Sequence, residues 1–515
     1  MKGISLLRRR NMRLYDSRKS VSSLAADIDG HGKQRRSAIN QRISVLLAAL
    51  GAPAVAAPDT KALVAALADA INPLSHSQAW LMLAVIGGRL PTSDEVVMAV
   101  RRAESDGPIA AARLAIWSGP AARYLDAGVL APVEVISDAV VVDVDHTAQV
   151  NFATGIQRVT RESVRRWVGQ HPEVTLVGWS RDQAALRALT PAEVRRACWG
   201  GPPVAEPEAG PILVPVNCTY LLPELATETV RTDALRGLAQ HSTNRFRVIG
   251  YDMCPITVPE TCGPTMPAAF ARNLSAVRYA GIVATISEAA AVEYQGWADM
   301  LPQIGVTGPR IVPCLLPNEP AATSPESVAV AEDRLLIGGL PMVLVVGSHE
   351  PRKNHLAVLH AAELLWREGH RFSLTFVGGN SWGSEQFISA LGSLQLRGRP
   401  VESISAASDD LLWGGYRLAR FSVFPSLNEG FGLPIVESIS CGTPVITSAF
   451  GSMREIAGAG GALMVDPRDD HALAGAMRVL LTDDAELTRL SEQALRRPVR
   501  TWDTYADEAW DVLMS

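Results

Sequence analysis

The stretch that most constrains the fold is residues 421–444, FSVFPSLNEGFGLPIVESISCGTP. It opens with residues 421–425, a short apolar run ended by proline, which is typical of a strand buried on both faces of a parallel sheet. Gly430 and Gly432 allow a sharp turn that brings backbone N–H groups close to a ligand. Pro434 suits the first turn of a helix. We therefore predict a strand, a glycine loop and a helix in direct succession.

The start of that helix is a predicted anion site. A helix N-terminus behind a glycine loop attracts anions through its free N–H groups and its dipole. Two carboxylates, Glu429 and Glu437, stand on either side of it in the sequence. With a diphosphate on the helix N-terminus, Glu437 could accept hydrogen bonds from ribose hydroxyls, and Glu429 could face the sugar. The spacing alone also fits two solvated glutamates.

The string from Glu429 to Pro434, continued to Glu437, resembles the donor-site motif of retaining glycosyltransferases with two Rossmann-like domains, specifically glycosyltransferase family 4. The resemblance covers roughly residues 135–515. It implies an α/β fold of the GT-B type, in which two Rossmann-like domains with parallel sheets face a cleft. It also implies that Glu429 is catalytic and orients the sugar. The donor would be bound by Gly430, Phe431, Gly432, Leu433 and Glu437.

A second motif, Glu-Pro-Arg-Lys-Asn, follows a predicted strand over residues 341–347. Two cations at a strand-to-helix turn suit a diphosphate leaving group, because negative charge grows on it as the glycosidic bond breaks. The string resembles the family's phosphate-binding turn, which implies catalytic roles for Arg352 and Lys353. Gly347, and Gly378 at the end of the next strand, are predicted to contact the donor.

Upstream, residues 135–320 are predicted to form the Rossmann-like domain that binds the acceptor. The string TGIQRV, after the first strand, resembles the family loop that faces the donor phosphates, and Gly155 would let the backbone approach them. Relatives commonly have a His-Asp pair after a later strand, where this chain has Tyr251 and Asp252. Only Asp252 carries over, as a catalytic contact to sugar or acceptor. A plain turn residue is the alternative.

The length of 515 residues predicts two or three domains. Residues 333–498 are predicted to form the donor domain. Residues 317–332, rich in proline and small side chains, are predicted to be the linker between the two domains. Residues 499–515 resemble the family's terminal helix, which crosses back to the acceptor domain.

The resemblance says nothing of the N-terminal part of the chain. Residues 1–44 carry eleven Lys and Arg against three Asp and show no apolar periodicity. They are predicted to be a flexible tail, either solvated or attached to an anionic membrane surface. Residues 45–130 are alanine-rich and are predicted to form a helical accessory domain.

Composition excludes several classes of protein. Residues 1–44 carry a net charge of about +8, so the net charge of -5 leaves about -13 for the rest of the chain, which argues against a nucleic-acid partner. The six cysteines show no paired spacing, so neither a zinc site nor a disulfide framework is predicted, and a cytoplasmic location fits best. We expect no metal and no other cofactor, since the nucleotide-sugar is a substrate. No segment reaches transmembrane length, so any membrane contact would be peripheral.

The motifs together predict a retaining glycosyltransferase that moves a sugar from a nucleotide diphosphate to a glycan or lipid-linked oligosaccharide. The EPRKN and TGIQR strings are most familiar in bacterial mannosyltransferases of surface polysaccharide, which makes GDP-mannose the first choice of donor. Two alternatives remain open. One is a non-catalytic scaffold of the same fold, and the other is a nucleotide-sugar epimerase of similar architecture.

Overall fold

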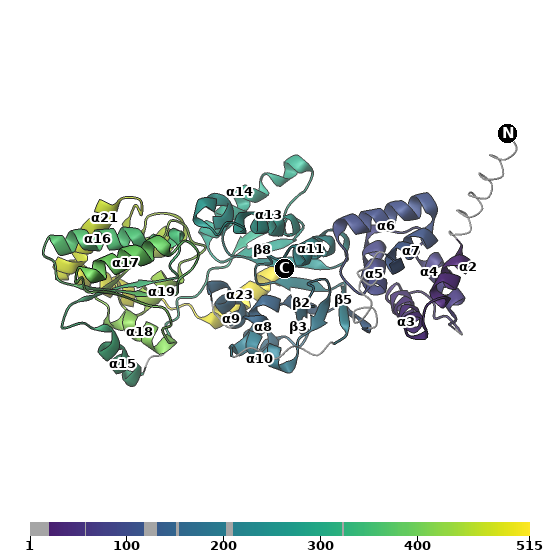
Figure 1. The fold of residues 1–515 in the computed structure, drawn as a ribbon, viewed down its shortest axis with the longest axis horizontal. Coiled ribbons are helices and arrows are strands. Elements are labelled where there is room, and N and C mark those ends of the chain that lie inside the picture. The colour runs from purple at the N-terminus through teal and green to yellow at the C-terminus, as the bar shows by residue number, and fades with distance from the viewer. Residues whose placement is uncertain (1–19, 57, 118–130, 151–153, 202–209, 322–323) are drawn as a thin grey trace.

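The computed structural model places three parts side by side, namely a helical module, a nine-stranded sheet and a six-stranded sheet (Figure 1). It describes residues 20–56, 58–117, 131–150, 154–201, 210–321 and 324–515. Outside these ranges lie residues 1–19 of the predicted tail, 57 and 118–130 of the predicted accessory domain, 151–153 and 202–209 of the predicted acceptor domain, and 322–323 of the predicted linker. Among the described residues, no helix is both long and apolar enough to cross a bilayer.

The C-terminal part is a fully parallel sheet in the order β12-β11-β10-β13-β14-β15, which is the strand order of a Rossmann fold. Its strands are mostly apolar because helices cover both faces, with α16, α17 and α21 above and α15 and α18 below in Figure 1. The strands are β10 (Met342–Val346), β11 (Ser373–Val377), β12 (Val401–Ile404), β13 (Phe421–Phe424), β14 (Val445–Ser448) and β15 (Ala462–Val465). The helices are α15 (Pro325–Leu335), η4 (Pro351–Lys353), α16 (His355–Arg367), α17 (Glu385–Leu396), α18 (Asp409–Leu418), α19 (Leu433–Ser440), α20 (Gly451–Ala457), α21 (Asp470–Thr482) and α22 (Asp484–Leu495).

The central part is a sheet in the order β1-β5-β4-β3-β2-β6-β7-β8-β9, parallel except for β4. Its strands are β1 (Val133–Ser137), β2 (Val140–Asp143), β3 (Val174–Trp179), β4 (Leu186–Ala188), β5 (Ile212–Val216), β6 (Thr219–Leu222), β7 (Arg245–Gly250), β8 (Ile282–Thr285) and β9 (Arg310–Pro313). Its helices are α8 (Asp145–Gln149), α9 (Gly155–Gln170), α10 (Pro191–Trp199), α11 (Thr229–His241), α12 (Cys254–Thr257), η2 (Pro259–Thr261), α13 (Met266–Val277), α14 (Glu288–Ala298) and η3 (Leu301–Ile304). One fully parallel sheet and one that is parallel except for β4, both covered by helices, confirm the predicted GT-B architecture. The central and C-terminal parts are called the acceptor domain and the donor domain after their predicted roles.

The chain passes between the two sheet domains twice, and the two passes are hydrogen-bonded to each other. The N–H of Asn318 donates to the carbonyl of Arg500 at 3.1 Å, and the N–H of Arg500 donates to the Asn318 side chain at 2.6 Å. The predicted linker over residues 317–332 is wrong in its second half, where α15 packs on α18 in the donor domain. Leu335 and Ala331 are fully buried there, so these small and apolar residues belong to a core rather than to a free connection.

The second pass leads into α23 (Trp502–Met514), which packs against α9 of the acceptor domain. The indole N–H of Trp167 donates to the carbonyl of Ala506 at 3.0 Å, and the ring of Trp510 stacks on the His171 ring with 3.7 Å between the ring centroids. The C-terminal helix therefore belongs structurally to the central domain, although its sequence follows the donor domain.

The N-terminal module is built from α2 (Val21–Asp29), α3 (Lys33–Ala49), α4 (Thr60–Ala70), α5 (His76–Gly87), α6 (Ser93–Asp106) and α7 (Pro108–Trp117). The prediction of a flexible tail over residues 1–44 is wrong for residues 20–44, which form α2 and most of α3. Ile39 and Ile43 of α3 are buried in one hydrophobic core with the central sheet. The basic residues misled the prediction because Arg42 is itself buried and donates to the carbonyls of Ile86 and Ala131, each at 3.0 Å.

The module is docked rigidly on the central domain. The hydroxyl of Ser93 donates to the Gln240 side chain of α11 at 2.8 Å. An ideal Cβ at Gly237 would lie only 2.1 Å from the carbonyl oxygen of Pro91, so α11 and the turn before α6 approach as closely as backbones can. The accessory helices and the central sheet thus share one folded unit.

Candidate active site

Two helix N-termini face each other where the sheet domains meet. On the donor side, α19 begins at Leu433 directly after the glycine loop that follows β13. On the acceptor side, α9 begins at Gly155, where a capping box joins Thr154 and Gln157. An ideal Cβ at Gly155 would lie 3.6 Å from Cδ1 of Leu433, so the two helix starts are in contact. Both ends carry the positive pole of a helix dipole, which makes the junction attractive to an anion.

The glycine loop leaves backbone donors without protein partners. Gly432 has φ 117°, a conformation that favours glycine, and serves as the N-cap of α19. Within the described part of the chain, the N–H groups of Gly430, Phe431 and Gly432 have no hydrogen-bond acceptor. Pro434 in the first turn has no N–H to satisfy. The predicted anion site therefore has both the free donors and the helix that such a site needs.

Gly430 must be a glycine for a second reason. An ideal Cβ at this position would lie 2.2 Å from the carbonyl oxygen of Tyr251 and 3.1 Å from Cβ of Asp252, both in the acceptor domain. No side chain fits there unless the two domains move apart. The contact places Asp252 beside the glycine loop.

Arg352, Lys353 and Glu429 form one ionic cluster beside that loop. Nη1 of Arg352 lies 2.7 Å from Oε2 of Glu429, and Nζ of Lys353 lies 2.6 Å from Oε1. The hydroxyl of Ser426 donates to the same Oε1 at 2.5 Å. Arg352 also pairs with Glu350 at 2.7 Å. The η4 turn and the glycine loop thus bring together the three charged residues that the two motifs predicted separately.

The charges of this cluster are strongly coupled. Burial favours the neutral acid at Glu429, yet Arg352 and Lys353 outweigh it and lower the pKa of that carboxyl to about 2. Burial also disfavours the charge of Arg352, but Glu429, Glu350 and Asp252 together raise the pKa of the guanidinium well above its ordinary value. Both groups are therefore charged at neutral pH, and Asp252 is close enough to contribute.

Gly347 and Gly378 lie at the ends of the neighbouring strands β10 and β11. An ideal Cβ at Gly378 would fall 1.9 Å from the carbonyl oxygen of Gly347, so the two backbones pack directly on each other. The aliphatic part of Lys353 passes over Gly347, whose ideal Cβ would lie 3.6 Å from the Lys353 chain. Gly378 is thus needed for the close approach of β10 and β11, and the predicted contact of both glycines with the donor remains a prediction.

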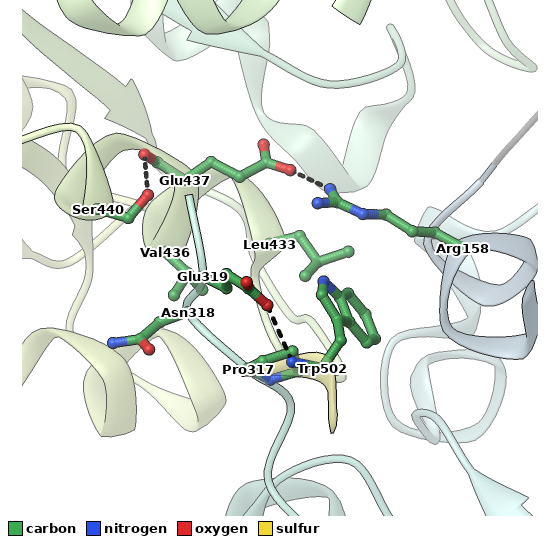
Figure 2. Close-up of a pocket in the computed structure, with 9 residues that line it drawn as sticks. All are labelled: Arg158, Pro317, Asn318, Glu319, Leu433, Val436, Glu437, Ser440 and Trp502. Carbon is green, nitrogen blue, oxygen red and sulfur yellow. Dashed lines mark hydrogen bonds and ion pairs between the residues drawn. The ribbon is translucent and has the colours of Figure 1, made fainter. Parts of the chain in front are cut away.

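Glu437 lies one turn inside α19 and faces the acceptor domain. Its Oε1 pairs with Nη1 of Arg158 at 2.5 Å, and its Oε2 accepts a hydrogen bond from the Tyr416 hydroxyl at 2.9 Å. Figure 2 shows the Arg158 and Glu437 side chains pointing toward each other, with Trp502 below the guanidinium. Neither Arg158 nor Tyr416 was predicted as a site residue. The only signal for Arg158 was its place at the end of the TGIQR string.

Asp252 precedes the short helix α12, and its side chain accepts a hydrogen bond from the N–H of Cys254 at 3.1 Å. It thus fulfils the turn role, while it also lies beside Gly430, where a sugar or acceptor contact is predicted. Tyr251, at the position where relatives commonly have histidine, points away. Its hydroxyl donates to the carbonyl of Pro223 at 2.6 Å inside the acceptor domain.

Three further contacts join the domains around the glycine loop. The Ser287 hydroxyl, which caps α14, donates to the carbonyl of Gly430 at 2.6 Å. The Asn428 side chain donates to Glu293 of α14 at 2.8 Å. Glu455 of α20 accepts from the N–H groups of Glu288 and Ala289 at 3.2 and 3.0 Å, so a donor-domain carboxylate completes the N-terminus of an acceptor-domain helix.

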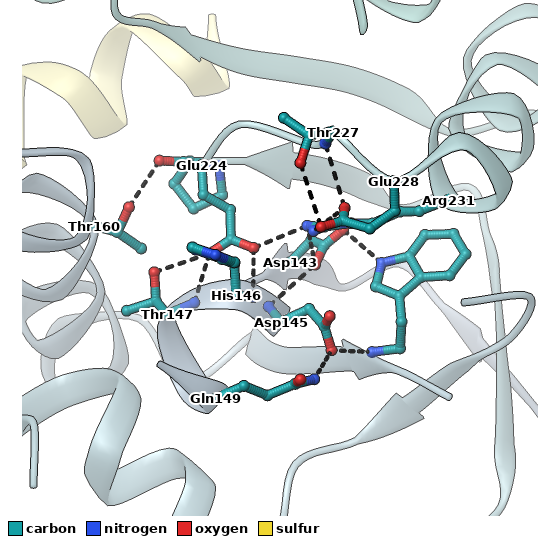
Figure 3. Close-up of polar contacts among 12 residues, drawn as sticks. Asp143, Asp145, His146, Thr147, Gln149, Thr160, Glu224, Thr227, Glu228 and Arg231 are labelled. Atoms are coloured by element: carbon teal, nitrogen blue, oxygen red, sulfur yellow. Dashed lines mark hydrogen bonds and ion pairs between the residues drawn. The ribbon is translucent and has the colours of Figure 1, made fainter. Parts of the chain in front are cut away.

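A buried polar network that the sequence did not predict supports the acceptor side (Figure 3). Arg231, fully buried, pairs with Asp143 at 3.0 Å and with Glu224 at 2.9 Å. Glu224 accepts from the N–H groups of His146 and Thr147, which fixes α8 at the end of β2. Burial raises the pKa of the nearby Asp145 to about 6, and the neighbouring Asp143 and Glu224 carboxylates add to the shift, while Arg231 opposes it. Within the described ranges, no group of three or more His, Cys, Asp and Glu is placed to hold a metal ion.

Comparison with known proteins agrees with this geometry. Residues 331–497 match the family described as glycosyl transferases group 1, so the C-terminal part is a glycosyltransferase domain. The O-antigen chain mannosyltransferase B of Escherichia coli is 37% identical over 146 residues, 28% of this chain and 37% of that protein. The serotype-specific mannosyltransferase WbdA of Escherichia coli is 26% identical over 336 residues, 61% of this chain and 38% of that protein. This chain therefore spans little more than a third of the length of either relative.

Solved structures show the same fold at low sequence identity. Sucrose-phosphate synthase of Thermosynechococcus elongatus superposes with a TM-score of 0.52 at 17% identity, over 73% of this chain and 98% of that one. HepE of Anabaena, in complex with UDP and glucose, gives a TM-score of 0.53 at 14% identity, over 73% and 99% of the two chains. The resemblance to glycosyltransferases that the sequence motifs carried is confirmed.

Proposed function

We propose that the chain is a retaining glycosyltransferase that transfers mannose from GDP-mannose to a glycan or a lipid-linked oligosaccharide in the synthesis of surface polysaccharide. The observation that carries the proposal is the arrangement at the junction of α9 and α19. There the free N–H groups of the glycine loop lie beside the ionic cluster of Arg352, Lys353 and Glu429. The choice of mannose rests on the EPRKN and TGIQR strings and on the names of the two relatives.

In this proposal the donor diphosphate binds between the N–H groups of the glycine loop and the two cations. Glu429 pairs with both cations in the structure. A diphosphate would compete for Arg352 and Lys353, and the released lone pairs of Glu429 would accept hydrogen bonds from the sugar hydroxyls. Glu437 would bind the ribose. The positive groups stabilise the negative charge that develops as the diphosphate leaves.

The reaction exchanges one bond at the anomeric carbon for another. The bond from that carbon to the diphosphate oxygen breaks, and an acceptor hydroxyl oxygen bonds to the same face of the sugar. The acceptor proton passes to the departing phosphate, so no protein nucleophile is required. Asp252, beside the glycine loop, would contact the sugar or the acceptor. We place the enzyme in the cytoplasm at the inner membrane surface, where the basic N-terminal residues could contact anionic lipid.

A ligand panel tests the donor site. Melting temperatures are measured with GDP, UDP, dTDP and ADP on the wild type, on Glu437→Ala and on the exposed control Glu492→Ala. A nucleotide at a hundred times its dissociation constant stabilises by about 2.7 kcal/mol. We expect GDP to raise the melting temperature of the wild type and of the control but not of Glu437→Ala. A shift with another base would correct the donor, and no shift with any base would refute the proposal.

A turnover assay then tests the reaction itself. GDP-mannose is incubated with the protein and a mannose-containing glycan, and free GDP and the elongated glycan are both measured. Transfer predicts that the two products appear in equal amounts and only when acceptor is present. A scaffold would release no GDP, and an epimerase would change the sugar without releasing the nucleotide.

A further inference from the structure

The carboxylate of Glu437 is held from two sides by donors of different domains. Arg158 of α9 reaches Oε1 at 2.5 Å, and Tyr416 of α18 donates to Oε2 at 2.9 Å. Among the described residues, each oxygen of this carboxylate therefore has one protein donor. Since an ionised carboxylate offers about four acceptor sites, one remains on each oxygen.

Both donors are themselves fixed. Tyr416 is fully buried, so its hydroxyl has little freedom. The Arg158 guanidinium lies over the ring of Trp502, with 5.7 Å between Cζ and the ring centroid. The backbone N–H of Trp502 donates to the Glu319 side chain at 3.1 Å, so Trp502 is itself tied to the first of the two passes between the domains. Figure 2 shows Arg158, Glu437, Trp502 and Glu319 around one pocket.

We propose that Arg158 is a positioning residue for the nucleotide, and that with Tyr416 it orients Glu437 to accept both hydroxyls of a vicinal diol. The inference rests on the proposed function, in which Glu437 binds the ribose. Two fixed donors set the plane of the carboxylate, and the remaining acceptor site on each oxygen then matches one hydroxyl of the pair. A nucleotide that lacks the 2′-hydroxyl leaves one of these acceptor sites unfilled in a mostly buried carboxylate, which is costly.

The consequence is selectivity for ribonucleotides that depends on a residue of the opposite domain. A plain salt bridge that only held the domains together would behave differently. Its loss would weaken the binding of every nucleotide by the same factor, because closure does not depend on the 2′-hydroxyl. The ratio of two affinities therefore separates the two roles.

Isothermal titration calorimetry with GDP and 2′-deoxyguanosine diphosphate measures this ratio. It is applied to the wild type, Arg158→Gln, Arg158→Lys and Arg165→Gln, the last a control on the same helix that pairs with Glu162. We expect the wild type and the control to prefer GDP by roughly tenfold, as for the loss of one hydrogen bond to a charged group. Arg158→Gln should reduce the preference below roughly threefold, and Arg158→Lys should restore part of it.

The measured affinities decide between the positioning role of Arg158 and a plain salt bridge. If Arg158→Gln binds both nucleotides more weakly but keeps the wild-type ratio, the positioning role is overturned while the proposed function stands. If the wild type binds neither nucleotide nor any other of the panel, the proposed function falls, and this inference falls with it. Tyr416→Phe provides a second variant should Arg158→Gln melt below the control, and it too should reduce the ratio.

Discussion

Replacing Glu429 by glutamine removes the one negative charge that Arg352 and Lys353 share. The pKa of Glu429 is lowered from an ordinary 4.5 to about 2. A change of one in pKa corresponds to about 1.36 kcal/mol, so the ionised side chain stabilises the folded protein by about 3 kcal/mol relative to its protonated form. Glutamine resembles the protonated form in shape and charge. We therefore expect Glu429→Gln to be less stable than the wild type by about 3 kcal/mol at pH 7.

The same argument fixes the pH dependence. Because the pKa of Glu429 is lower in the folded than in the unfolded protein, its stabilisation is fully present above pH 4.5 and is lost as the pH falls towards 2. The wild type and Glu429→Gln should therefore differ most at neutral pH and converge as the solution is made acidic. Other carboxylates titrate in both proteins, so their contribution cancels from the difference.

Thermal unfolding at pH 7 and at pH 3 tests both statements. For a domain of this size, about 2–4 °C per kcal/mol gives a difference of about 6–12 °C at pH 7, and at pH 3 this difference should fall to less than half. Glu492→Gln, which breaks an exposed pair with Arg496, serves as control and should lie within about 2 °C of the wild type. A Glu429→Gln protein that melts with the wild type at pH 7, or whose deficit persists unchanged at pH 3, would refute the electrostatic reasoning.

Three further predictions address other parts of the molecule. Gly430→Ala should abolish GDP binding, as measured by calorimetry, without unfolding the protein, because its methyl group collides with the Tyr251 carbonyl and holds the domains apart; binding at wild-type affinity would contradict this. Arg231→Met should lower the free energy of unfolding, measured in urea, by about 3–5 kcal/mol, since it leaves two buried carboxylates without their cation. An unchanged free energy of unfolding would show that the network does not stabilise the fold. Ile43→Ala should lower the free energy of unfolding by about 2–5 kcal/mol because the side chain is fully buried, whereas Gln41→Ala, at an exposed position, should leave it almost unchanged. Equal stabilities of the two variants would support the original prediction of a flexible tail over residues 20–44.

Local pattern was sufficient for the donor domain. Buried parallel strands appear in sequence as continuous apolar runs, and glycine and proline mark where they end, so β13, the glycine loop and α19 could be placed from residues 421–444 alone. Pro434 lies in the first turn of α19, as predicted, and the helix begins one residue before it at Leu433. The cluster of Arg352, Lys353 and Glu429 was predicted in its members, although their pairing in the ligand-free protein was not.

What escaped prediction depends on contacts between distant parts of the chain. Arg158 and Glu437 are 279 residues apart, and nothing local marks them as a pair. In α3, only Ile39 and Ile43 supply an apolar spacing within residues 33–44, and Arg42 between them looks like a surface residue. Its burial is compensated by two carbonyls from other elements. Lone charged residues are usually exposed, so pattern reasoning assigned this one to solvent.

The contact of Glu455 with the start of α14 has a consequence for how the protein is made. The central domain emerges from the ribosome first, and domains generally fold as units in that order. Yet the N–H groups of Glu288 and Ala289 receive their acceptor from a residue synthesised more than 160 positions later. During synthesis these two N–H groups therefore lack this acceptor until Glu455 has been made, at the surface of the central domain that contacts the donor domain. The central domain is completed later still, when α23 has been made and packs on α9.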